Sequence, residues 1–160
     1  MKIINQDRLD QLCREAVESQ RLRKNLNMHD DFADPCQRLF NAIEPGTYIR
    51  PHRHLNPPKP ECFMAVRGRM GLVVFNDEGE IEQFVPFGAG CDAVAVELLP
   101  CQWHTLLAFE SGSIFFETKP GPYLPLSDKD FAPWSPVEGG QDAVDYLTLL
   151  MAKVTEIQLL

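Results

Sequence analysis

The chain has 160 residues, a length that predicts one domain with a core large enough to fold without disulfide or oligomer support. Its 44% hydrophobic and 24% charged residues are typical of a soluble globular protein and exclude a disordered chain. The 15 basic and 23 acidic residues give a net charge of −8, which nucleic-acid phosphates and anionic membrane surfaces would repel. We therefore expect neither nucleic acid nor a membrane as a partner.

The N-terminal segment lacks the apolar core of a signal peptide, and no stretch is apolar for long enough to cross a bilayer. The five cysteines form no CxxC pair. In a chain without a secretory signal, this pattern favours buried or free thiols in a reducing environment. We therefore expect a cytoplasmic protein.

Secondary structure is predicted first as an amphipathic helix within residues 1–20, with Asn5 as its N-cap. After a basic stretch at 21–29, short apolar or alternating runs are separated by turn residues. These runs are 37–42, 62–66, 70–76, 81–87, 93–99, 105–109 and 113–118. Closely spaced short strands without helices between them predict an antiparallel β-sandwich or barrel, not a parallel α/β fold.

The C-terminal part is proline-rich after residue 119 and then predicts a second amphipathic helix from about 141 to 153. We divide the chain into an N-terminal helix and basic arm (1–34), a β-barrel (35–120) and a proline-rich arm with a C-terminal helix (121–160). All three parts are expected to form one structural domain. Apolar residues left over on the terminal helices are expected either to cover the barrel or to mediate a homodimer.

Two of the four histidines form the pattern His52-x-His54, and alternate residues of a strand point to the same face. Glu61 follows after a loop with three prolines, whose stiff turn would return the chain beside the histidine pair. His104 lies in a later apolar run. Three neutral imidazoles and one carboxylate suit one divalent transition metal ion, such as Zn, Fe, Mn or Ni. The alternative is a chance pair of strand histidines.

The basic stretch contains the candidate substrate-binding residues Arg21, Arg23 and Asn27, and the candidate acid–base residue His29. It is interpreted either as an arm that folds over the barrel mouth and binds a phosphate or carboxylate, or as a solvated turn. His29 is a general acid or base, a hydrogen-bonding partner of the site, or simply exposed.

Further candidates lie on the predicted strand at 113–119, where Glu117 and Lys119 share one face. They either line the barrel, with Glu117 as a catalytic proton carrier and Lys119 as a substrate contact, or form an exposed ion pair. Arg50 and Tyr123 complete the substrate-binding candidates. The phenol of Tyr123 either reaches the site or packs elsewhere.

The spacing of Gly46, His52-x-His54, Glu61 and Gly68 resembles the first cupin motif, G-x5-H-x-H-x(3–6)-E-x6-G. The second cupin motif is matched at His104 but departs from the pattern around it. The resemblance implies a jelly-roll barrel that holds its metal ion inside the barrel mouth.

A further resemblance, to the WbuC family, covers most of the chain. It is carried by Arg21-x-Arg23-x-x-x-Asn27-x-His29, Gln37-Arg38, Asn41-Ala42, Pro51-His52-Arg53-His54, Trp103-His104, Gly121-Pro122-Tyr123 and Phe131-Ala132-Pro133-Trp134-Ser135-Pro136-x-Glu138. That family comprises small cupin-fold metalloproteins associated with bacterial O-antigen or other surface-polysaccharide gene clusters. The resemblance implies that His52, His54, Glu61 and His104 are the metal ligands.

Together these features predict a metal-dependent isomerase or epimerase that acts on a small anionic or carbohydrate substrate, such as a sugar or sugar phosphate. The gene-cluster association of the resembling family suggests this substrate class. An Fe(II)-dependent dioxygenase and a non-catalytic metal- or ligand-binding module are the alternatives.

Overall fold

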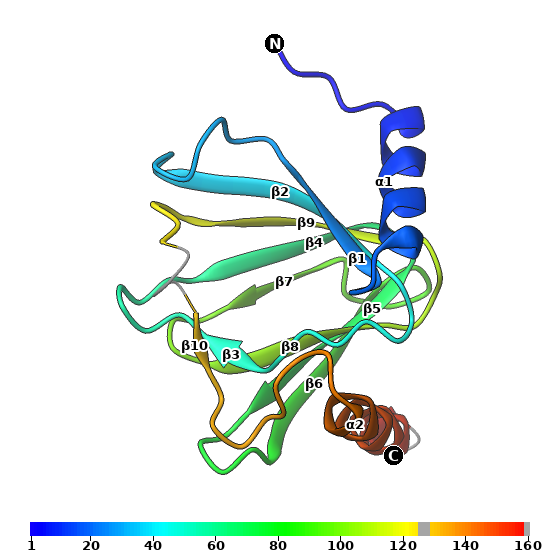
Figure 1. The fold of residues 1–160 in the computed structure, drawn as a ribbon, viewed down its shortest axis with the longest axis vertical. Coiled ribbons are helices and arrows are strands. Elements are labelled where there is room, and N and C mark those ends of the chain that lie inside the picture. Colours follow the sequence, from blue (N-terminus) through cyan, green and yellow to red (C-terminus); the bar gives the residue numbers. More distant parts are fainter. Residues whose placement is uncertain (125–128, 159–160) are drawn as a thin grey trace.

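The computed structural model describes residues 1–124 and 129–158 and consists of two antiparallel five-stranded sheets with one helix near each end of the chain (Figure 1). The first sheet contains, in spatial order, β1 (Arg23–Asn27), β2 (Cys36–Ile43), β9 (Ser113–Pro120), β4 (Glu61–Arg67) and β7 (Ala95–Leu98). The second contains β10 (Asp130–Phe131), β3 (His52–Arg53), β8 (Trp103–Ala108), β5 (Arg69–Phe75) and β6 (Ile81–Gly88). This architecture confirms the predicted mainly-β fold. Part of the expected proline-rich arm, residues 125–128, and the last two residues lie outside the described chain.

The main core lies between the two sheets, where the inward side chains of each sheet meet. Its buried members are Ile43, Phe63, Met70, Leu72, Val74, Phe87, Leu98, Leu106, Ala108 and Phe115. Strand β9 shows why its sequence is apolar at neighbouring positions, because both of its faces are covered. Phe115 points into the main core, and Ile114 packs on the opposite face beneath the first helix.

Helix α1 (Gln6–Glu18) begins at the predicted N-cap, where the Asn5 side chain accepts a hydrogen bond from the Arg8 backbone N–H at 3.0 Å. The helix buries Leu12 against Ala42 and other apolar residues on the outer face of the first sheet. Burial of this stripe follows from the three- and four-residue spacing of its apolar side chains.

Helix α2 (Gln141–Gln158) covers the outer face of the second sheet, with Leu150 and Val154 packed against Val73 and Trp103. It runs five residues beyond the predicted end at 153 because no proline or glycine stops it there. Neither of the described helices is long and apolar enough to cross a membrane.

The glycines that frame the predicted motif occupy positions that other residues would strain. Gly46 has φ +93° and Gly68 has φ +74°, both in the left-handed region that favours glycine. An added Cβ at Gly68 would also lie 2.9 Å from the Cα of Ser113. Gly68 therefore allows the tight connection between β4 and β5.

Strands β1 and β10 have no counterpart among the strands predicted from sequence, and β3, the strand expected at His52-x-His54, ends at Arg53. The basic stretch expected as an arm contains β1, which pairs along its whole length with β2. Strands β3 and β10 have two residues each and pair with one another. A polar edge strand such as β1, and strands of only two residues such as β3 and β10, lack the alternation on which sequence prediction depends.

Candidate metal centre and its cavity

The three histidines and the glutamate singled out in the sequence meet inside the barrel. His52, His54, Glu61 and His104 are each at most 4% exposed, and one potential ligand atom from each lies within 4.8 Å of the others. The meeting follows from strand register, because His52 of β3 is paired directly with His104 of β8, with ring centroids 4.4 Å apart. Glu61 joins them from the first residue of β4.

The backbone orients two of the imidazoles in the same way. Nδ1 of His52 lies 3.0 Å from the Arg50 carbonyl oxygen, and Nδ1 of His104 lies 3.0 Å from the Gln102 carbonyl oxygen. A carbonyl only accepts hydrogen bonds, so each Nδ1 carries the proton and donates it. In its neutral form, each ring therefore presents the lone pair of Nε2, as metal-ligating histidines commonly do.

Glu61 supplies the observation that best tests the fit to a metal ion. Its Oε2 lies 3.0 Å from His104 Nε2, yet this buried oxygen has no hydrogen-bond partner of acceptable geometry among the described residues. Two lone-pair-bearing atoms thus face each other in a buried site, which is unfavourable unless a cation lies between them. A divalent ion coordinated by both atoms satisfies them, so the donor set fits a transition metal.

The carboxylate of Glu61 also belongs to a buried ionic chain. Lys119 Nζ lies 2.9 Å from Glu61 Oε1 and 2.9 Å from Glu117 Oε1, and the Asn41 side-chain amide donates to Glu117 Oε2 at 3.0 Å. Lys119 is 8% exposed and Glu117 is 9% exposed. Of the two arrangements expected for this pair, the structure therefore has the inward one.

Electrostatics keeps this chain charged. Burial alone would raise the pKa of Glu61, but the Lys119 charge holds it well below its usual range. Burial likewise opposes the charge of Lys119, but Glu117 and Glu61 raise the pKa of its ammonium above the usual value. Burial, with smaller contributions from neighbouring cations, lowers the pKa of His52 well below its usual value, so this imidazole is neutral.

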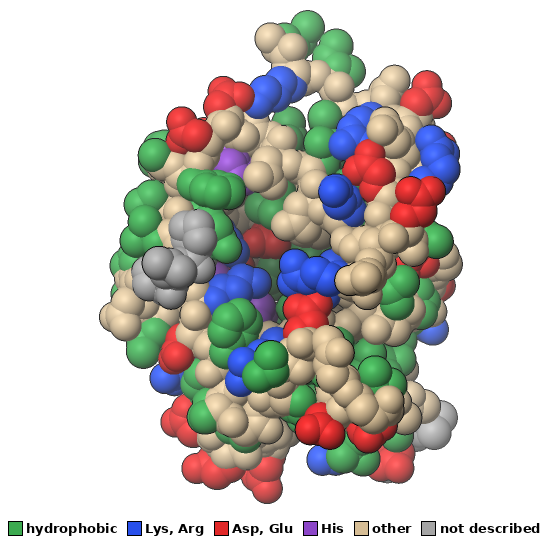
Figure 2. Space-filling view, viewed as in Figure 1, with side chains coloured by type: hydrophobic (Ala, Val, Ile, Leu, Met, Phe, Trp, Pro, Cys, Tyr) green, Lys and Arg blue, Asp and Glu red, His purple; other side chains and the backbone are tan. Residues whose placement is uncertain are grey.

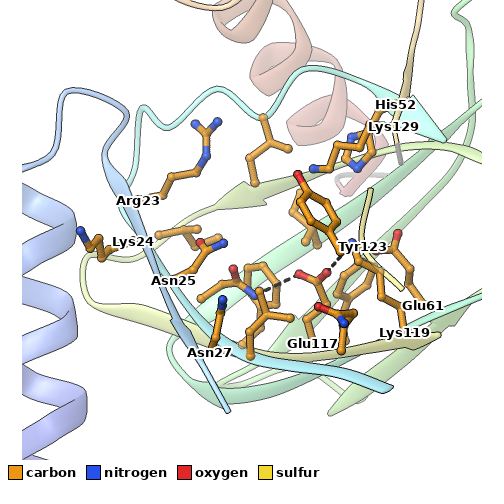
Figure 3. A pocket seen from close by; sticks show the side chains of 18 of the residues that line it. Arg23, Lys24, Asn25, Asn27, His52, Glu61, Glu117, Lys119, Tyr123 and Lys129 are labelled. Atoms are coloured by element: carbon orange, nitrogen blue, oxygen red, sulfur yellow. Dashed lines mark hydrogen bonds and ion pairs between the residues drawn. The ribbon is translucent and has the colours of Figure 1, made fainter. Parts of the chain in front are cut away.

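A cavity of about 780 Å³ opens onto the cluster, with His52, Glu61 and His104 in its wall (Figure 3). Figure 2 shows the hollow on this face of the molecule, with lysine and arginine side chains gathered around it. The charged residues of the described lining are Arg21, Arg23, Lys24, Arg50, Lys119, Lys129, Glu61, Glu117 and Glu138. Six cations and three anions leave a lining charge of +3, in a chain whose net charge is −8. Such a focus of positive charge attracts anions.

Lys129 is a lining residue that sequence reasoning missed. It is partly buried and lies just before β10. Figure 3 shows its side chain extending into the cavity on the side of His52. Burial and the charge of Lys119 lower the pKa of Lys129 to about 8, so it is still mostly protonated at pH 7. No local pattern marks this lysine, because its place depends on how the chain returns after β9.

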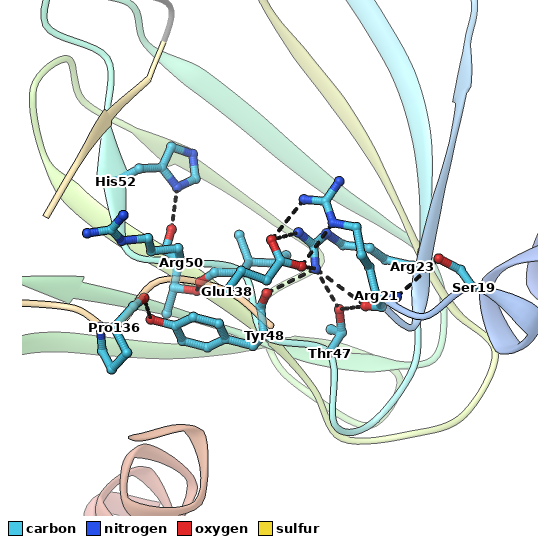
Figure 4. A network of polar contacts seen from close by, with 11 residues as sticks. Ser19, Arg21, Arg23, Thr47, Tyr48, Arg50, His52, Pro136 and Glu138 are labelled. Atoms are coloured by element: carbon cyan, nitrogen blue, oxygen red, sulfur yellow. Dashed lines mark hydrogen bonds and ion pairs between the residues drawn. The ribbon is translucent and has the colours of Figure 1, made fainter. Parts of the chain in front are cut away.

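Arg21 and Arg23 line the same cavity but have an anionic partner within the chain, Glu138 (Figure 4). Arg21 Nε donates to Glu138 Oε1 at 2.9 Å, and Arg23 Nη2 donates to Oε2 at 2.8 Å. Arg23 also donates to the Tyr48 carbonyl oxygen at 2.9 Å. The two arginines thus fasten the C-terminal arm to the barrel wall, and their contact with a substrate stays a prediction.

The remaining candidates also line the cavity, and nothing in the structure tests their predicted roles. His29 is buried, and its Nδ1 lies 3.0 Å from both the backbone nitrogen and the carbonyl oxygen of Arg38. Arg50 donates to Ser135 Oγ at 3.1 Å and to the Ala132 carbonyl oxygen at 3.2 Å. Asn27 and Tyr123 complete the set, and Figure 3 shows the Tyr123 hydroxyl directed into the cavity.

Residues 4–86, just over half of the chain, match the model of a family described as "Domain of unknown function (DUF6016)". No curated protein matches the sequence.

Solved structures with the cupin fold resemble the chain at low sequence identity. An oxalate oxidase in complex with the substrate analogue glycolate matches with a TM-score of 0.55 and 12% identity, over 73% of this chain and 58% of its own. An L-ribose isomerase from Cellulomonas parahominis, solved with L-psicose, has a TM-score of 0.53 and 13% identity, over 71% of this chain and 70% of its own. An oxalate decarboxylase from Bacillus subtilis has a TM-score of 0.51 and 13% identity, over 68% of this chain and 27% of its own. The chain thus spans 58% of the length of the oxalate oxidase. The likeness of these structures confirms the predicted cupin fold.

Proposed function

The chain belongs to the DUF6016 family of domains of unknown function, and we propose that it is a metal-dependent enzyme that isomerises or epimerises a small anionic or carbohydrate substrate. One observation carries the proposal. Buried, backbone-oriented imidazoles and an unsatisfied carboxylate oxygen meet in the wall of a cavity with a positively charged lining.

The proposed ligands of one divalent transition metal are His52, His54, Glu61 and His104. A bound divalent ion would polarise a carbonyl or hydroxyl oxygen of the substrate and lower the pKa of the attached group. Four protein ligands leave coordination positions for the substrate on an ion that accepts five or six. The volume of about 780 Å³ is within the range of small-molecule sites.

The proton carrier in this proposal is Glu117, which lines the cavity beside the cluster. Lys119 and Asn41 each hold one of its carboxylate oxygens, so the group is fixed in position and retains lone pairs to accept a proton. His29 is the second candidate. Its Nδ1 lies 3.0 Å from both the backbone nitrogen and the carbonyl oxygen of Arg38, and these contacts hold the ring in the cavity wall.

The resemblance to the WbuC family supports a cytoplasmic role in bacterial surface-polysaccharide metabolism, and a sugar or sugar phosphate as the substrate. The Cellulomonas isomerase was solved with a sugar, L-psicose, which supports including free sugars among the test substrates. Glycolate, the substrate analogue bound to the oxalate oxidase, supports including small hydroxy acids. A homodimer remains a proposal that rests on exposed apolar side chains of α2, such as Val144 and Leu149.

A second candidate, an Fe(II)-dependent dioxygenase, is favoured by the apolar part of the cavity wall. Phe63, Leu106 and Phe115 line the cavity, and the Phe63 ring centroid lies 6.2 Å from that of His104. A wall of this kind limits water near an oxidising centre. Oxygen consumption by anaerobically iron-loaded protein distinguishes this candidate from the isomerase.

The test is a panel of sugars, sugar phosphates and hydroxy acids, followed by NMR for isomerised products. Protein with verified metal content is compared with chelator-treated protein, with Glu117→Gln and with Lys153→Met, an exposed charge change on α2. We expect turnover that needs metal, is lost in Glu117→Gln and is unchanged in Lys153→Met. The absence of metal-dependent turnover across the panel would contradict the proposed isomerase, and product formation without oxygen would contradict the dioxygenase.

A further inference from the structure

We infer that Lys129 binds the anionic group, a carboxylate or phosphate, of the molecule that enters the cavity beside the histidine cluster. The inference deepens the proposed function and rests on it for the nature of that molecule. The evidence for Lys129 itself comes from charges, burial and contacts within the described chain.

The first argument is that the Lys129 ammonium has no hydrogen-bond or ion-pair partner among the described residues. No residue in the described ranges 1–124 and 129–158 forms a hydrogen bond or an ion pair with it. Glu117 and Glu61 attract it at longer range, but both carboxylates already contact Lys119. A partly buried cation that gains no anion from the described part of the chain has lost water contacts without compensation, which is unfavourable until an anion arrives.

The second argument is that the other cations of the cavity are engaged or exposed. Lys119 bridges two carboxylates, and Arg21 and Arg23 share Glu138. Arg50 donates to a hydroxyl and a backbone carbonyl and lies over the Phe131 ring at 5.1 Å. Lys24 is exposed, so water can solvate it.

The third argument is the position of Lys129 beside His52 in the cavity. Among the cations around His52, Lys129 is the one whose charge acts most strongly on that imidazole. Figure 3 shows the two side chains on the same side of the cavity. A molecule that reached the histidine cluster through this cavity would therefore pass within reach of the Lys129 ammonium. The lining charge of +3 favours an anion in that place.

A carboxylate and a phosphate have the same basis for recognition here, since each offers anionic oxygens to a single ammonium. The experiment therefore uses glycolate and inorganic phosphate as separate probes, with ethylene glycol as the neutral control. Calorimetric titrations compare the parent protein with Lys129→Met, which keeps the length but removes the charge, and Lys129→Arg, which keeps the charge. Lys153→Met is the matched loss of an exposed lysine charge. Each protein is titrated in metal-free and metal-loaded form.

We expect at least one anion to bind the parent and ethylene glycol not to bind. A charge-assisted hydrogen bond corresponds to roughly a 10- to 150-fold change in affinity, so Lys129→Met should weaken anion binding by about that factor. Lys129→Arg should retain most of the affinity, and Lys153→Met should match the parent. The anion that binds more tightly identifies the carboxylate or the phosphate as the group recognised.

The inference is overturned if neither anion binds the parent, or if Lys129→Met binds as tightly as the parent. Its failure is distinguishable from failure of the proposed function. A parent protein that holds no metal but loses anion binding in Lys129→Met would contradict the metal-dependent enzyme and support the role of Lys129. A protein that binds metal, and whose anion affinity is unchanged in Lys129→Met, would contradict the role of Lys129 and leave the metal-dependent enzyme supported.

Discussion

Replacement of Lys119 by methionine should destabilise the protein strongly, and less so when metal is bound. Lys119 is 8% exposed and bridges Glu61 and Glu117 at 2.9 Å each, so its loss leaves two buried carboxylates without their cation. Removal of one partner from a buried ion pair typically costs about 3–5 kcal/mol. For a chain of this size, 1 kcal/mol corresponds to about 2–4 °C, so the unfolding temperature of the metal-free protein should fall by roughly 6–20 °C.

A divalent ion at the histidine cluster would compensate the charge of Glu61 but leave Glu117 uncompensated. The stability loss caused by Lys119→Met should therefore shrink to about half when metal is saturating. Urea and thermal unfolding of parent and variant, each with and without metal, measure this difference. Lys153→Met, which removes an exposed lysine on α2, should change stability by less than about 0.5 kcal/mol.

Two results would refute this reasoning. A loss below about 1 kcal/mol in metal-free Lys119→Met would place the pair in the range of surface ion pairs. An equal loss with and without bound metal would mean that the ion does not compensate the Glu61 charge.

Three further changes test separate parts of the structure. Burial lowers the pKa of His52 well below its usual value near 6.5, so below about pH 6.5 the unfolded chain binds a proton that the folded, metal-free protein does not. The free energy of unfolding should therefore decrease as the pH is lowered through this range, by up to about 1.4 kcal/mol per pH unit. His52→Gln should make this pH dependence shallower in urea titrations. An equal pH dependence in parent and variant would argue against a buried neutral imidazole. Glu138→Gln removes the carboxylate that Arg23 contacts at 2.8 Å, so unfolding should become easier by about 1–2 kcal/mol, and an unchanged unfolding temperature would show that the C-terminal arm is held by other contacts. In Gly68→Ala, the alanine must adopt φ +74° and its Cβ must approach Ser113, so the free energy of unfolding in chemical denaturation should decrease by at least about 1–2 kcal/mol. An unchanged free energy of unfolding would mean that the turn rearranges freely.

The residues of the candidate metal centre could be identified in the sequence because their spacing has a direct structural meaning. His52 and His54 are separated by one residue, and a stiff proline-containing loop brings Glu61 back beside them. The joining of His104 to this group depends on the pairing of β3 with β8, which no local pattern specifies. A resemblance to cupin proteins supplied that assignment, and strand register explains it.

Other parts of the site depend on contacts between distant segments and could not be predicted in the same way. The alternation of Glu117 and Lys119 indicated a shared face but could not decide whether that face was inside the barrel. Strand β1 is polar and lies at a sheet edge, so its sequence suggested an arm. Lys129 follows a proline-rich segment without periodicity, and only the folded chain brings it to the cavity.

The most direct test of the central claim is an anomalous difference map from crystals of zinc-loaded protein, recorded at the zinc absorption edge. The account predicts one strong peak per chain at about 2.0–2.2 Å from a nitrogen of each of His52, His54 and His104 and from a carboxylate oxygen of Glu61. A well-phased map with no peak between these side chains, or with zinc bound only elsewhere on the chain, would contradict it.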